Sequence, residues 1–187
     1  MFNPVSADSS ALVPLSAHPA APCSEKLQLA AQAARLADGS LQLHFELAGA
    51  LERLKLPPWQ DTAGFADGLW QHSCFEVFVG LSDAPRYHEF NFAPSGHWAA
   101  YAFSAERQRD PHWSPALAPQ CAVRRSAQQL SLSAQIPAAL LPAPASAWQI
   151  GLTAVIETAS GALSYWALKH VAAQPDFHQA ASFILPR

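Results

Sequence analysis

The chain has 187 residues, of which half are apolar and 13% carry a charge, and its formal net charge is −3. This length supports one sizeable hydrophobic core, whereas two domains would each be small, so a single domain is expected. The basic residues are scattered rather than clustered, which argues against nucleic acid as a partner because phosphate binding needs a basic surface. No apolar stretch reaches the roughly 18 residues that span a bilayer, so we expect a soluble protein without a membrane partner.

Residues 1–22 are rich in Ser, Ala and Pro and contain neither Lys nor Arg. They lack the basic start and the continuous apolar run of a secretory signal, and we expect a loosely ordered N-terminal arm. The three cysteines, Cys23, Cys74 and Cys121, are widely spaced and include no C-x-x-C pair. This spacing argues against a disulfide framework and against a structural zinc site, so a reducing cytoplasm is the expected location.

The first two structured segments differ in how clearly the sequence defines them. Residues 41–47 alternate apolar and polar side chains, as a half-buried strand does. Residues 27–35, with the sequence LQLAAQAAR, favour a helix by their alanines alone. If the two segments form a hairpin across the turn at 37–39, the alanine-rich segment is a strand as well, because strand pairing can override so weak a preference.

The strongest β signal lies in residues 74–80, 87–92 and 97–103, which place aromatic and branched side chains at every second position. The short turns between them predict an antiparallel meander. Alternation returns at 121–125, 130–136, 148–158 and 163–169, and a short final strand is expected near 182–185. Roughly eight to ten short strands without a long amphipathic helix predict an all-β fold, an antiparallel β-sandwich or a barrel.

Side-chain alternation sorts the first hairpin of this meander onto two faces. Phe75, Val77 and Val79 share one side of their strand, which we assign to the core, and Glu76 then points outward. If the hairpin closes at residues 80 and 87, Glu76 lies beside Asn91 on the next strand.

The third strand adds an aromatic group under a second assumption about register. If Phe92 lies opposite His97, Asn91 faces Trp98, while Tyr101 and Phe103 point into the core. A row of carboxylate, amide and indole groups suits a polyhydroxy ligand, because the polar groups fix hydroxyls while the ring covers the apolar side of a sugar.

Other polar side chains are expected on or near the same face. Glu89 shares it with Asn91, and Lys169 and His170, at the end of the segment 163–169, could reach it. The alternative is that these groups only solvate the outer face of a sheet.

Catalytic and metal-binding interpretations have less support. Glu76 and Glu89 on one face would also allow a paired-carboxylate glycosidase, but neighbouring glutamates are common on outer sheet faces, and we assign no catalytic residue. The loop cluster of Asp176, His178 and His170 lacks a motif such as H-E-x-x-H, so no metal site is predicted.

Four stretches together carry a resemblance to a known family. They are LWQHSCFEVFV at 69–79, YHEFNFAPSGHWAAYAF at 87–103, SYWALKH at 164–170 and PDFH at 175–178. In these stretches the chain resembles the bacterial DOMON-like proteins, a group related to the family 9 carbohydrate-binding modules. The resemblance implies that residues 23–187 form one DOMON-like β-sandwich that binds a sugar or a haem on one sheet face or its rim.

The residues present favour a sugar over a haem. Haem-carrying relatives hold the iron with Met and His, and the chain has Met1 as its one methionine, while none of its eight histidines stands out as an axial ligand. Sugar-binding relatives use stacked tryptophans with Glu, Asn and Arg contacts, and the resemblance implies that Trp70, Glu76, Glu89, Asn91 and Trp98 could play these parts here. The sequence thus predicts a non-catalytic domain that binds a saccharide or sugar-like metabolite. No cofactor is expected, haem binding is the alternative, and a homo-oligomer is left open.

Overall fold

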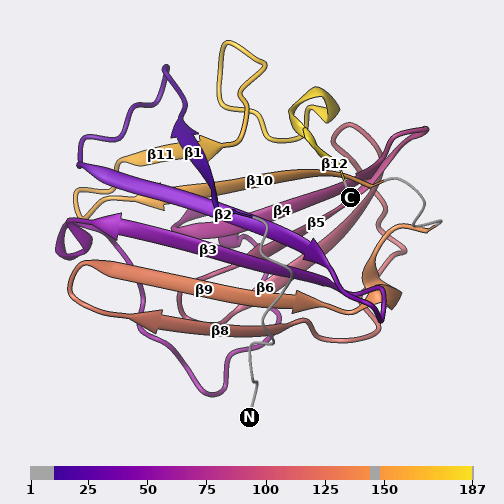
Figure 1. Cartoon of the computed structure of the whole chain (residues 1–187), viewed down its shortest axis with the longest axis horizontal. Helices are drawn as coiled ribbons and strands as arrows, with labels where there is room; N and C mark the ends of the chain where they lie inside the picture. Colours follow the sequence, from indigo (N-terminus) through magenta and orange to yellow (C-terminus); the bar gives the residue numbers. More distant parts are fainter. Residues whose placement is uncertain (1–10, 144–147, 187) are drawn as a thin grey trace.

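The computed structural model describes residues 11–143 and 148–186, and these residues form twelve antiparallel strands in one curled sheet. The strand order is β7-β6-β5-β4-β10-β11-β1-β2-β3-β9-β8, with β12 paired to β10. The sheet folds over itself, so that β2, β3, β9 and β8 lie in front of β10, β4, β5 and β6 in Figure 1. The bounds are β1 Val13–Ala17, β2 Leu27–Arg35, β3 Leu41–Gly49, β4 Cys74–Leu81, β5 Ala84–Phe92, β6 Trp98–Ala105, β7 Gln108–Arg109, β8 Gln120–Arg125, β9 Gln129–Ile136, β10 Trp148–Glu157, β11 Leu163–Ala167 and β12 Leu185–Pro186.

Helical structure in the described residues is confined to four single 3-10 turns. They are η1 Leu51–Arg53, η2 Leu69–Gln71, η3 Ala138–Leu140 and η4 Ala180–Ser182. Within the described ranges, no helix has the length and apolar character needed to cross a bilayer.

The main core fills the space between the two layers. Phe45 of β3 meets Phe75 of β4 across it, with 5.3 Å between the ring centroids. The β2–β3 hairpin forms as expected, and Ala31 and Ala33 of β2 are fully buried. The alanine-rich segment is therefore a strand, because its pairing with β3 and the burial of one face outweigh a weak helical preference.

Strand β1 corrects the expectation of a loosely ordered arm at residues 1–22. Val13–Leu15 pair with β2, and Ser16 and Ala17 pair with β11, so that β1 joins the two layers along one side. Figure 1 shows β1 between β11 and β2. The sheet therefore begins before residue 23, and the sequence conceals it because the strand is short, contains Pro14 and pairs with a segment about 150 residues away. Residues 1–10 of the predicted arm lie outside the described residues.

The register of the meander agrees with the sequence in the first hairpin and differs by one residue in the second. Glu76 lies opposite Asn91, as predicted. Trp98, however, lies opposite Phe92, and Asn91 faces Ala99. The turn has three residues, 94–96, rather than two: the Ala93 amide donates to His97 O at 2.9 Å, and Gly96 has φ +91°.

This shift by one residue reverses the faces of β6, because side chains alternate along a strand. Trp98 packs against the main core, whereas Tyr101 and Phe103 lie on the outer face beside Glu89. The prediction that Trp98 points outward and that Tyr101 and Phe103 point inward is therefore wrong.

The outer face of β4, β5, β6 and β10 carries a second apolar cluster, which the C-terminal segment partly covers. Phe177 and Phe183 of that segment contact Phe78 of β4, and the Phe183 and Phe78 rings stack with centroids 5.5 Å apart. A Cβ on Gly151 would lie 2.7 Å from Phe183 Cδ1, so the glycine is needed for this close approach.

Candidate functional site

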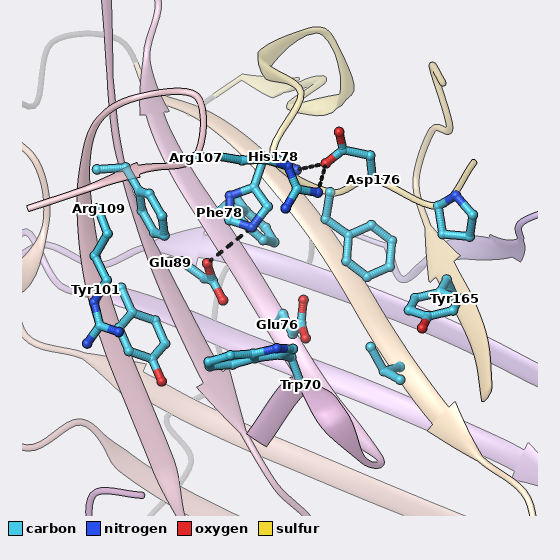
Figure 2. A pocket seen from close by; sticks show the side chains of 14 residues that line it. Trp70, Glu76, Phe78, Glu89, Tyr101, Arg107, Arg109, Tyr165, Asp176 and His178 are labelled. Atoms are coloured by element: carbon cyan, nitrogen blue, oxygen red, sulfur yellow. Dashed lines mark hydrogen bonds and ion pairs between the residues drawn. The ribbon is translucent and has the colours of Figure 1, made fainter. Parts of the chain in front are cut away.

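A cavity of about 370 Å³ opens on the outer face of the meander, between the C-terminal segment and the η2 turn. Its lining comes from the floor strands β4, β5, β6 and β10, from η2, β11, the β6–β7 turn and β7, and from residues 175–178. Figure 2 shows this arrangement, with Glu76 and Glu89 between the walls formed by Trp70, Tyr101 and Tyr165.

Two carboxyl groups lie at the floor. Glu76 on β4 and Glu89 on β5 expose 2% and 5% of their surface, yet both line the cavity. Glu76 Oε2 accepts a 3.3 Å hydrogen bond from Thr153 Oγ1, while Glu76 Oε1 has no partner in the described part of the chain. Buried acceptors without donors are costly, so this floor favours a ligand that brings donors.

Asn91 forms a hydrogen bond with one of the two floor carboxyl groups, that of Glu89. Asn91 is fully buried, donates its amide to Glu89 Oε1 at 2.8 Å, and leaves its own Oδ1 without a partner among the described residues. Asn91 does not line the cavity itself, so it acts on Glu89 rather than on a bound molecule.

The environment favours the protonated form of both carboxyl groups. Burial, followed by repulsion from Glu89, raises the pKa of Glu76 well above its ordinary value. Burial also raises the pKa of Glu89 to about 7, although the bond from Asn91 and the charges of Arg109 and Arg107 act in the opposite direction. The two floor carboxyl groups therefore keep their protons to a higher pH than ordinary glutamates do.

His178 lies near this pair without forming an ion pair with it at neutral pH. Its Nε2 is 3.9 Å from Glu89 Oε2, the contact drawn dashed in Figure 2. Burial, followed by the charge of Arg107, lowers the pKa of His178 to about 4, so the imidazole is neutral. Its Nδ1 lies 2.7 Å from the Tyr87 hydroxyl, which also accepts from the Arg107 amide at 3.1 Å.

Charged groups at the mouth are paired with one another. Arg107 donates to Asp176 Oδ1 at 2.8 Å, and its positive φ of 56° turns the chain at this point. Arg109 lies over the Tyr101 ring at 4.1 Å from the centroid. Both side chains stay about half exposed, so the cations line the mouth and not the floor.

Aromatic rings form much of the wall. Trp70 on η2 is 41% exposed and contacts Tyr101 edge to face, with centroids 5.7 Å apart. Phe103 stacks on Tyr87 at 4.7 Å and completes the wall on the β6 side. An exposed indole beside buried acceptors is an arrangement that can hold a small molecule with one apolar and one polar side.

The structure brings together three of the seven residues predicted for the site. Trp70, Glu76 and Glu89 line the cavity. Glu76 and Asn91 are paired as predicted, but Asn91 is outside the cavity lining and Trp98 faces the main core, so the predicted row lacks its indole. Lys169 is exposed and outside the lining, and His170 Nε2 lies 2.8 Å from Ser16 O, where it ties β11 to β1.

Several lining residues were missed by sequence reasoning. Tyr101 and Phe103 were placed in the core by the one-residue register error. Asp176 and His178 were noted as a loop cluster, but their distance along the chain gave no sign that they line the same cavity as Glu89. In the described residues no group of His, Cys, Asp and Glu side chains has the arrangement of a metal site.

No family model matches the sequence, and no curated protein sequence matches it either. Solved structures do share its fold. A proposed carbohydrate-binding protein from Bacteroides uniformis superposes with a TM-score of 0.67 at 16% identity, over 93% of this chain and 84% of that one. A family 9 carbohydrate-binding module from Caldicellulosiruptor kristjanssonii in complex with glucose gives 0.59 at 10% identity, over 97% and 92%.

A family 9 module from the same organism, in complex with cellotriose, gives a TM-score of 0.50 at 9% identity, over 87% of this chain and 80% of that one. Identities this low show a shared fold alone. The chain therefore has an all-β, antiparallel β-sandwich of the kind found in family 9 carbohydrate-binding modules, and the predicted fold class is confirmed.

Proposed function

We propose that this protein binds a saccharide or a sugar-like metabolite, without transforming it, in the cavity above Glu76 and Glu89. We further propose that it is a DOMON-like relative of the family 9 modules. One observation carries the proposal: an exposed indole and two buried carboxyl groups line the same cavity of about 370 Å³. A cavity of this size suits a mono- or disaccharide better than a long polymer.

The chemistry of the lining matches a pyranose ring. The ring has one face of C–H groups, which an aromatic side chain such as Trp70 can cover, and a rim of hydroxyls that donate and accept hydrogen bonds. Glu76 Oε1 is a buried acceptor without a donor, and a ligand hydroxyl would supply one. The fold supports the same proposal, because structural neighbours include modules solved with glucose and cellotriose.

Isothermal titration with glucose, cellobiose and cellotriose tests the proposal. Trp70→Ala should weaken binding several-fold, up to about tenfold, because a stacked aromatic contact contributes about 0.5–1.5 kcal/mol. Trp59→Ala is the matched control: Trp59 is 44% exposed, close to the 41% of Trp70, but it does not line the cavity. Equal losses in both variants, or no saccharide binding by the wild type across a broad glycan panel, would overturn the proposal.

A sugar-modifying enzyme is the second candidate, because the two floor carboxyl groups have raised pKa values of the kind that acid–base catalysis uses. Glu76→Gln separates the two functions when binding and hydrolysis are assayed together. Loss of turnover with retained binding would favour the enzyme, whereas the binding proposal expects no turnover in either protein.

The cavity fits a haem poorly. Its lining contains one imidazole, that of His178, whose Nδ1 already lies 2.7 Å from the Tyr87 hydroxyl and whose Nε2 faces a carboxyl group. Met1 lies outside the described residues. A visible absorption spectrum of the protein purified from haem-supplemented cells tests this alternative, and a Soret band would favour it over an apo saccharide binder.

A further inference from the structure

When they are ionised, the two carboxyl groups of the cavity floor offer hydrogen-bond acceptors and no donors. Glu76 Oε1 has no partner among the described residues, although the side chain is 2% exposed and lines the cavity. Glu89 Oε2 has one near neighbour, the imidazole of His178 at 3.9 Å, which is beyond hydrogen-bond distance. A ligand that binds the ionised pair therefore has to supply at least two hydrogen-bond donors, one for each carboxyl group.

The aromatic side chains in the cavity walls also favour a positively charged ligand. Trp70, Tyr101 and Phe103 line the cavity together with the two carboxyl groups, and the faces of aromatic rings attract cations. Arg109 already lies over the Tyr101 ring and Phe103 stacks on Tyr87, so Trp70, which is 41% exposed, is the most accessible of the three to a ligand cation. A desolvated cation gains from such rings and from a carboxylate together, whereas a neutral hydroxyl gains mainly from the carboxylate.

Among the residues that the structure describes, the two cationic side chains that line the cavity lie at its mouth and not at its floor. Arg107 is held at the mouth by Asp176 at 2.8 Å, and Arg109 lies over the Tyr101 ring, 4.1 Å from its centroid, and 3.9 Å from Asp67 Oδ1. Figure 2 shows both guanidinium groups away from the floor, with Glu76 and Glu89 facing the open space. Two nearby buried carboxyl groups are thus left without a buried cation of their own.

We propose that the floor between Glu76 and Glu89 is a subsite for a protonated amine, so that the preferred saccharides are amino sugars with a free amino group. This inference rests on the proposed saccharide binding and deepens it. An ammonium group has three donors, which suits the unpartnered Glu76 Oε1 and Glu89 Oε2, whose near neighbour His178 Nε2 lies 3.9 Å away. The charge of the ammonium group replaces the proton that the carboxyl pair otherwise retains.

The exchange of a proton for a cation makes binding depend on pH. Burial keeps both carboxyl groups protonated up to higher pH than usual, so acid should oppose binding of the amine by keeping the floor neutral. The other charged or titratable groups around the floor are Arg107, Arg109, Asp176 and His178. Cys74, Tyr87 and Tyr101 also lie nearby, but burial raises the pKa of each, that of Tyr87 to about 12, so they stay neutral. Tyr165 on β11 is a further titratable residue that lines the cavity.

Calorimetry with glucosamine, glucose, N-acetylglucosamine and putrescine tests the inference. At about pH 7.5, glucosamine should bind about tenfold or more tightly than glucose, and N-acetylglucosamine no more tightly than glucose, since acetylation removes the charge. The preference should shrink toward one at about pH 5, and the heat in two buffers of different ionisation enthalpy should report proton release on glucosamine binding.

Glu76→Gln should reduce the glucosamine preference toward one, whereas Glu52→Gln, at an exposed glutamate on η1, should leave it unchanged. The pH series and the proton-release measurement use the wild type, so they test the amine subsite even if Glu76→Gln does not fold. Equal affinity for glucosamine and glucose would overturn the amine subsite and leave saccharide binding intact. Binding of putrescine without any sugar would support the subsite and overturn saccharide binding, and failure of every amine to bind would overturn the subsite.

Discussion

The side-chain amide of Asn91 donates a 2.8 Å hydrogen bond to Glu89 Oε1, two residues earlier on the same strand. Both residues are buried, and this bond opposes the effect of burial on the carboxyl group. The ionisation of the cavity floor therefore depends on a residue that does not line the cavity.

Asn91→Ala should raise the pKa of Glu89 above its value of about 7, because the variant removes a donor that favours the ionised form. Carbon-13 NMR of the glutamate carboxyl groups during a pH titration measures the change. Thr153→Val is the matched control, since Thr153 donates to Glu76 and not to Glu89. A Glu89 titration that is the same in Asn91→Ala and in the wild type would contradict the prediction.

Glu89 should make the stability of the fold depend on pH. Its pKa is about 7 in the folded protein against an ordinary value of 4.5, so its contribution to stability is complete below about pH 4.5 and is lost as the pH rises through about 7. Glu89→Gln stays neutral throughout. The free energy of unfolding of the wild type minus that of the variant should therefore fall over this range, by at most about 1.4 kcal/mol per pH unit.

Chemical denaturation of the two proteins at matched pH measures this difference. The lowered pKa of His178 acts in the opposite sense, because its contribution is lost as the pH falls from 6.5 to about 4. Subtraction at each pH largely cancels that effect, since His178 is present in both proteins. A difference that does not change with pH would show that Glu89 ionises in the folded protein as freely as in the unfolded chain.

Gly151→Ala should destabilise the protein by about 1–3 kcal/mol, because the added methyl group would meet the Phe183 ring at 2.7 Å and force the C-terminal segment away from Phe78. Gly64→Ala is the control, since a Cβ there meets nothing within 4 Å, and its effect should stay within about 0.5 kcal/mol. Thermal and urea unfolding measure both changes. Similar stabilities for the two variants would mean that Phe183 adjusts without cost.

Tyr87→Phe should loosen the segment that covers the cavity. The hydroxyl of Tyr87 joins β5 to His178 at 2.7 Å and to the Arg107 amide at 3.1 Å, and its loss should cost about 1–2 kcal/mol. Hydrogen exchange should become faster at residues 175–183 and at the β6–β7 turn. Tyr165→Phe is the control, because it removes a hydroxyl from another wall of the cavity and should leave hydrogen exchange unchanged in both regions. Faster exchange in both regions in both variants would contradict the prediction that the Tyr87 hydroxyl holds these segments.

Much of the sheet could be predicted from the sequence because alternation reports which side of a strand is buried. The inward position of Phe75 and Val77 and the outward position of Glu76 follow from period two alone. The pairing of Glu76 with Asn91 followed from the closing residues of one short hairpin. Both predictions depend only on residues close together in the sequence, and a short hairpin allows few strand registers.

The composition of the site, by contrast, was decided by tertiary structure. A three-residue turn in place of a two-residue turn moved Trp98 into the core and Tyr101 onto the cavity wall, and the pattern of β6 is apolar on both sides, so it could not reveal the error. Asp176, His178 and Arg107 reach the cavity from segments far apart in the chain, where no local pattern predicts contact.

Strand alternation was enough to predict the all-β fold class and the outward direction of Glu76 and Glu89, because apolar and polar side chains alternate along each of these strands. Alternation did not predict that these carboxyl groups are buried and line a cavity with residues 175–178 instead of lying on an open sheet face. Strand periodicity sets the direction in which a side chain points, whereas its burial and ionisation depend on which distant segments pack near it.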